Sequence, residues 1–122
     1  SSMRNRVPLF ISGDLHAIGE GRMLATGTHD LSRNPVTSIL AGPLGTFRGW
    51  PSSGSRGMRP EVPAGIRFEE TQPPIEQNGF IITDFTADRI VIRFFKWDVR
   101  TQTIADIDAL EPFRVTELKR PV

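Results

Sequence analysis

Asp14 and His16 are the residues whose types and spacing most clearly suggest chemistry, and they stand in the segment Phe10-Ile11-Ser12-Gly13-Asp14-Leu15-His16. If the backbone stays extended, the two side chains point to the same side, with Cα atoms about 7 Å apart. The metals of a hydrolytic pair lie about 3.5–4 Å apart, so a carboxylate and an imidazole at this spacing can address one metal centre. Gly13 allows the backbone to turn there or to approach a ligand.

A purely structural explanation of this segment stays open. Gly-Asp is a common turn sequence in which the aspartate bonds its own backbone, and a lone histidine is often structural. The second histidine, His29, is less favoured as a ligand, because Asp30 before Leu31-Ser32 is typical of a helix or turn cap. Arg22, six residues past His16, is predicted to bind substrate, since arginine suits bidentate contact with phosphate. A solvated loop arginine is the alternative for Arg22.

The composition limits the possible metals and partners. The chain has 122 residues and no Cys, which excludes disulfides and thiolate metal sites. A metal held by His and carboxylates would be Mn, Fe, Zn, Mg or Ca rather than an iron–sulfur cluster. The 15 basic and 14 acidic residues are spread along the chain, so no nucleic-acid partner is expected. No apolar run has the length of a membrane span.

The elements that must position Asp14 and His16 are predicted to be strands. Runs rich in apolar and β-branched residues predict a mainly β chain, with a mixed or antiparallel sheet of about five strands and long loops. The predicted strands are 9–13, 36–40, 79–85 and 90–97, with a last strand at either 104–110 or 113–118. The polar link 86–89 has hairpin length. The turn-rich stretch 42–74 is expected to be loop.

The stretch from Leu9 to Met23, LFISGDLHAIGEGRM, resembles the last conserved block of the alkaline phosphatase D-like branch of calcineurin-type metallophosphoesterases. The order and spacing of later pieces resemble the same branch. These are Asn34-Pro35-Val36 leading to Gly42-Pro43, then Gly49-Trp50-Pro51, then Asn78-Gly79-Phe80 with Asp84-Phe85, and finally the run from Val91 to Trp97. Together the pieces span most of the chain.

The resemblance implies a binuclear metal centre that hydrolyses phosphate monoesters or diesters. In the wider superfamily the block reads Gly-His-x-His, and in this branch Gly-Asp-x-His. His16 would then be a metal ligand, and Asp14 would be either a ligand or a partner that holds one. The parent fold would be a four-layer α-β-β-α sandwich, of which this chain is most of one sheet with its loops.

The earlier blocks of that family, which supply further Asp, Asn and His ligands, have no counterpart here. One His and a few carboxylates cannot hold two metals in hydrolytic geometry. We therefore expect residues 1–122 to be a single domain or the C-terminal fragment of a larger metallophosphoesterase, inactive by itself and lacking an N-terminal catalytic part. The alternative is a stand-alone β-rich module for binding or assembly. Strands that are apolar on both faces also predict self-association, as a dimer.

Overall fold

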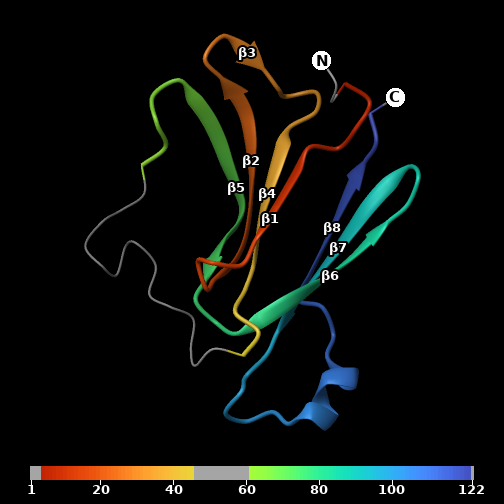
Figure 1. The fold of residues 1–122 in the computed structure, drawn as a ribbon. Helices are drawn as coiled ribbons and strands as arrows, with labels where there is room; N and C mark the ends of the chain where they lie inside the picture. Colours follow the sequence, from red (N-terminus) through yellow and green to blue (C-terminus); the bar gives the residue numbers. More distant parts are fainter. Residues whose placement is uncertain (1–3, 46–60, 122) are drawn as a thin grey trace.

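The computed structural model describes residues 4–45 and 61–121, which form two β-sheets packed against each other. The first sheet contains β1 (Leu9–Ser12), β2 (Ile18–Thr26), β3 (His29–Asp30), β4 (Val36–Ala41) and β5 (Ile66–Ile75). The second contains β6 (Gly79–Phe85), β7 (Arg89–Lys96) and β8 (Arg114–Lys119), and a 3₁₀ helix, η1 (Ile104–Ala109), precedes β8. Figure 1 shows β1, β2, β4 and β5 grouped on one side of the molecule and β6, β7 and β8 on the other.

The pairing of the first sheet makes β2 its central strand. β4 and β5 lie antiparallel on either side of β2, and the short β3 pairs with the end of β2 at Ala25 and Thr26. β1 lies parallel to β4 at the edge, in the register Leu9 to Thr37. The sheet is therefore mixed, as the sequence predicts.

The second sheet is a fully antiparallel meander. β6 and β7 form a hairpin from Gly79–Lys96 pairing to Phe85–Ile90 pairing, closed by the polar link at 86–89. β8 pairs with the other edge of β7. The hairpin agrees with the prediction from the two apolar runs.

The core lies between the two sheets. Ile18 of β2, Ile39 of β4, and Ile92 and Phe94 of β7 are completely buried, and Leu118 of β8 closes the cluster. Each such side chain contributes about 1.5–3 kcal/mol, as an upper bound, to the free energy of unfolding. The core thus fixes β2 and β4 against β7 and β8.

Two expectations about the elements are wrong, and one open alternative is decided. The chain forms two sheets with eight strands in the described residues, not one sheet of about five. No strand was predicted over residues 18–26, which form β2, and most of β5, at 66–75, falls in the stretch 42–74 that was expected to be loop. Of the two candidates for the last strand, 104–110 contains η1, whereas 113–118 largely matches β8. Gly49-Trp50-Pro51 lies outside the described residues.

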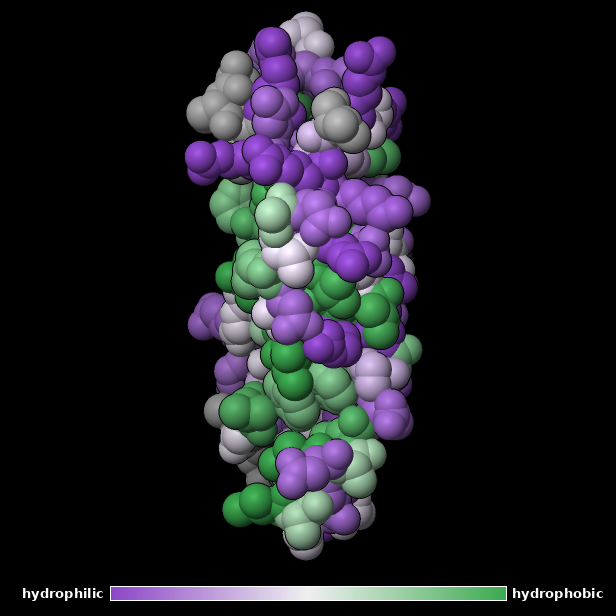
Figure 2. Space-filling view, turned by 90° about the vertical axis from the view of Figure 1, so that its right-hand side faces the viewer, coloured by the Kyte–Doolittle hydropathy of each residue, from purple (hydrophilic) through white to green (hydrophobic). Residues whose placement is uncertain are grey.

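Hydrophobic side chains also remain exposed outside this core. They include Ile82, Phe85 and Val115 of the second sheet and Phe10 and Phe68 of the first. Figure 2 shows hydrophobic residues over the middle and lower part of the face seen from the side of β6–β8, below a hydrophilic upper end. The apolar runs of β6 and β7 are therefore not completely buried on both faces of the second sheet. No helix in the described part of the chain is long and apolar enough to cross a membrane.

Candidate functional site

The loop between β1 and β2 carries both predicted metal ligands. The backbone turns at Asp14 and Leu15, so the extended geometry on which the 7 Å spacing depends does not occur. Asp14 is exposed and His16 is half-buried. His16 has a φ of 48°, the left-handed region that residues other than glycine enter rarely and at a cost of about 1–2 kcal/mol. The surrounding structure therefore holds His16 in a backbone conformation that residues other than glycine disfavour.

Within the described part of the chain, Asp14 and His16 have no polar side-chain partner. Neither side chain forms a hydrogen bond or ion pair with another described residue. Within residues 4–45 and 61–121, no three His, Asp or Glu side chains are grouped closely enough to hold a metal ion. The loop therefore offers two donors of the chemistry that a hydrolytic metal accepts, and a complete site would need further ligands.

His29 lies at the opposite end of β2 from this loop. It is exposed in β3, where it pairs with Thr26. The next residue, Asp30, accepts a hydrogen bond of 2.9 Å from the backbone N–H of Ser32, which confirms its predicted role in a turn. That backbone hydrogen bond is the main reason why the pKa of Asp30 lies below its usual value.

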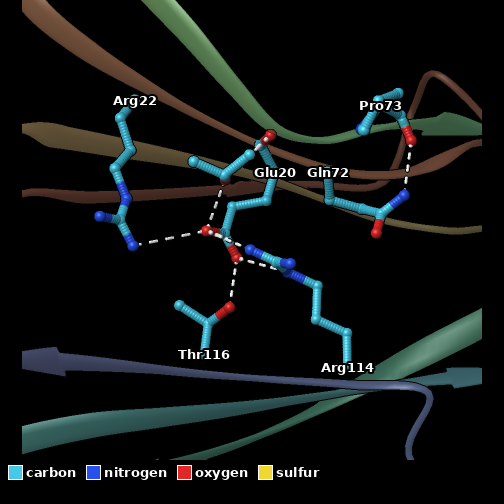
Figure 3. Close-up of polar contacts among 7 residues, drawn as sticks. Glu20, Arg22, Gln72, Pro73, Arg114 and Thr116 are labelled. Atoms are coloured by element: carbon cyan, nitrogen blue, oxygen red, sulfur yellow. Dashed lines mark hydrogen bonds and ion pairs between the residues drawn. The ribbon is translucent and has the colours of Figure 1, made fainter.

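A second polar cluster lies between the sheets around Glu20, whose side chain is completely buried. Figure 3 shows its carboxylate between the guanidinium groups of Arg22 and Arg114, with Thr116 directed at it from β8. The hydroxyl groups of Thr71 and Thr116 donate to Oε1 at 2.6 Å and to Oε2 at 2.5 Å. Arg114 donates from Nη2 to Oε1 at 3.2 Å and from Nε to Oε2 at 3.4 Å. One carboxylate on β2 thus joins the first sheet to the second.

Two opposing effects set the pKa of Glu20. Burial, the largest single influence, raises the pKa by disfavouring the charged form. The hydrogen bonds from Thr116, Thr71 and Arg114, together with the charge of Arg114, lower it by a greater total amount. The net effect is a pKa below the usual 4.5, so Glu20 is ionised at neutral pH.

Arg22 belongs to this cluster and not to the loop of His16. It lies in the middle of β2, four residues past Ile18, which is about 13 Å along a strand. Its Nη2 is 3.7 Å from Oε1 of Glu20, and its Nε is buried without a hydrogen-bond partner among the described residues. An unsatisfied buried donor costs about 1–3 kcal/mol. The sequence separation from His16, which led to the prediction of substrate binding, therefore does not translate into proximity.

The cluster around Glu20 could not be predicted from the local sequence. Glu20 lies between Gly19 and Gly21, and nothing local marks a glutamate in that setting as buried. Its partners Arg114 and Thr116 are 94 and 96 residues away in the chain. Only the packing of the two sheets brings them together.

Comparison of the chain with protein-family models, with curated proteins and with solved structures found no match.

Proposed function

We propose that the chain is the C-terminal portion of a binuclear-metal phosphatase or phosphodiesterase, to which it contributes Asp14 and His16. The observation that carries the proposal is the β1–β2 loop. It presents a carboxylate and an imidazole without partners among the described residues, and it holds His16 in an unfavourable backbone conformation. Strain of this kind is concentrated at functional sites.

The donor chemistry of the loop fits the implied metals. When bound, two metal ions would activate a water molecule and stabilise the attacking and leaving oxygens of a phosphate ester. His16 would hold one of them through its imidazole, and Asp14 would either add a carboxylate oxygen or orient another ligand. Mn, Fe, Zn and Ca all accept this pair of donors. The substrate would be a phosphate monoester or diester.

The remaining ligands would come from the missing N-terminal catalytic part. Two observations support this division of the site. The described residues contain no group of three possible ligands, and large hydrophobic side chains such as Phe10, Phe85 and Val115 are exposed. Packing of these side chains against another part of the protein would remove their apolar surface from water.

A stand-alone β-rich module for binding or assembly is the second candidate. It is favoured by the closed core of Ile18, Ile39, Ile92 and Phe94 and by the buried bridge from Glu20 to β8. These features give the chain its own stabilising contacts. Such a module would use neither Asp14 nor His16 for chemistry.

Hydrolysis by the product of the complete reading frame distinguishes the two. An upstream Gly-Asn-His-(Asp/Glu) block and metal-dependent hydrolysis of bis-p-nitrophenyl phosphate are expected. The His16→Ala variant should lose at least about 100-fold in rate, because altering even an outer-shell partner of a metal typically costs about 10–100-fold. His29→Ala removes the other, exposed histidine and should keep the wild-type rate. Unchanged hydrolysis in His16→Ala would contradict the proposal.

A further inference from the structure

A basic pocket is lined by residues of both sheets, from β2 and β4 on one side and from β8 on the other. In Figure 1, the segment before β1 lies beside the end of β8 at this end of the molecule. The volume of the pocket is about 290 Å³. Four cationic residues line it, Arg22, Arg33, Lys119 and Arg120, against one acidic residue, Glu117. Neither Asp14 nor His16 is part of the lining, so the pocket is distinct from the loop described above.

Arg22 gives this pocket a guanidinium charge that its ion pair with Glu20 does not balance closely. Its Nε is buried without a hydrogen-bond partner among the described residues, and its Nη2 approaches Glu20 only to 3.7 Å. Glu20 already accepts hydrogen bonds from Thr71, Thr116 and Arg114. Since Arg114 balances the single charge of Glu20 at shorter distances, the charge of Arg22 is in excess.

The other charges add to this excess. Glu117, the acidic residue of the lining, pairs with Arg89 at 3.6 Å and with Lys119 at 3.8 Å. Arg120 uses its Nε to donate to the backbone oxygen of Asn5, which holds its guanidinium at the wall. Arg33 is exposed at the rim. The pocket therefore combines one inner guanidinium with a cationic rim.

We infer that this pocket binds a phosphate group, either as free phosphate or as the head of a small organic phosphate, through the Arg22 guanidinium. Arginine matches a tetrahedral oxyanion with paired N–H donors, and the Arg22 side chain, which is 34% exposed, lines the pocket. The apolar part of the lining, which includes Val7, Pro35 and Leu118, provides room for a small organic group. The inference does not depend on the metal-site proposal, because no residue is shared between the two sites.

Calorimetric titration of the full 122-residue chain with inorganic phosphate, in chloride buffer of constant ionic strength and with a chelator present, tests this. Saturable binding of one phosphate per chain is expected. Arg22→Gln should weaken it by about tenfold or more, the loss typical of a charged hydrogen bond. Arg33→Gln, at the exposed rim, should weaken it by about threefold. Arg67→Gln removes the same charge from the exposed Arg67–Asp30 pair of β5 and should change affinity by less than about twofold.

Two further measurements keep the test decisive. Arg22→Lys keeps the charge beside Glu20 but lacks the paired N–H donors of a guanidinium, and it should weaken binding by about fivefold even if Arg22→Gln does not fold. Phenylphosphonate binding more tightly than phosphate would identify an organic phosphate as the occupant, and the reverse order would identify free phosphate. No saturable binding at about 10 mM phosphate, or equal losses in Arg22→Gln and Arg67→Gln, would overturn the inference. Because the titration contains no metal, its outcome leaves the hydrolysis proposal unaffected.

Discussion

At the scale of single residues, the polar contact between the two sheets depends on Glu20. Its carboxylate is buried where the sheets meet and accepts hydrogen bonds from both of them. A buried charge of this kind is costly unless it is fully paired, and removing one partner leaves the other uncompensated. At His16, by contrast, the unusual feature is the backbone conformation.

Glu20→Gln is expected to lower the free energy of unfolding by about 3 kcal/mol, because Arg114 would remain partly buried without its counter-charge. Denaturant unfolding followed by circular dichroism measures the change. Glu117→Gln is the matched control, since its pair with Arg89 is partly exposed and should contribute less than about 1 kcal/mol. Equal losses in the two variants would show that the buried bridge has no special role.

Stability should fall in acid, partly through Glu20. Its pKa is lowered in the folded chain, so its contribution is complete above the unfolded value of about 4.5 and is lost as the pH falls through the folded value. Asp30, Asp88, Asp98 and Asp106 also have lowered pKa values and act in the same direction. Unfolding measured from pH 6 downward should therefore show a weaker pH dependence in Glu20→Gln than in the wild type. An identical slope would contradict the lowered pKa.

His16→Gly should raise the free energy of unfolding by up to about 1 kcal/mol, because glycine adopts a positive φ without the clash of a Cβ atom. His16→Ala keeps the Cβ atom and should give no such gain. A stabilising glycine would indicate that His16 is retained for something other than folding. If His16→Gly were destabilising, the histidine would have a structural role instead.

At the scale of elements, the close contact between β2 and β5 depends on a glycine in β2. The ring of Phe68 on β5 lies over Gly21, where a side chain on β2 would collide with it. Glycine at this position thus permits the β2–β5 contact that also brings Thr71 to Glu20. Gly42 follows the last residue of β4 and has a φ of 87°. Ile18 and Gly79 lie close to it.

Gly21→Ala is expected to cost about 1 kcal/mol, the low end of the range for overpacking, because the Phe68 ring that the added Cβ atom would meet is 40% exposed and has room to shift. Gly13→Ala is the control, because nothing lies within 4 Å of an added Cβ atom there. Adding Phe68→Ala to Gly21→Ala should recover part of the loss, since it removes the ring that collides. A double-variant cycle in thermal unfolding measures this, and strictly additive losses would contradict the contact.

The predictability of these elements follows their burial. The β6–β7 hairpin could be predicted because its β-branched and aromatic residues supply the core, as Ile92 and Phe94 show. β2 could not, since Gly19, Glu20, Gly21 and Arg22 interrupt any apolar pattern and depend on partners in other strands. β5 contains Pro73 and Pro74, which indicate a loop in sequence but are tolerated in an edge strand. The separation of Arg22 from His16 was likewise set by the fold and not by sequence distance.

At the scale of the whole molecule, two sheets enclose one core and leave apolar side chains exposed outside it. The exposed set includes Ile82 on β6 and Val115 on β8, which are 45% and 56% exposed. Apolar surface that is not covered favours contact with another chain or another part of the same protein.

We expect the 122-residue chain to sediment as a dimer. The variant that combines Ile82→Lys with Val115→Lys should shift the equilibrium toward monomer. Charged side chains at these two positions of β6 and β8 would oppose burial of the second sheet in a dimer contact. Ile104→Lys, in η1 and 84% exposed, is the control and should leave the dimer intact. Sedimentation velocity over a range of concentrations measures the equilibrium. A monomer at the highest concentration would refute the expectation.

We propose that Asp14 and His16 are part of a metal site completed by an N-terminal part. The most direct test of this proposal is the metal content of the protein from the complete reading frame, measured by inductively coupled plasma mass spectrometry after purification without chelators. We expect two metal ions per chain in the wild type and in His29→Ala, and a loss of at least one in His16→Ala. Equal metal content in His16→Ala and wild type would contradict it.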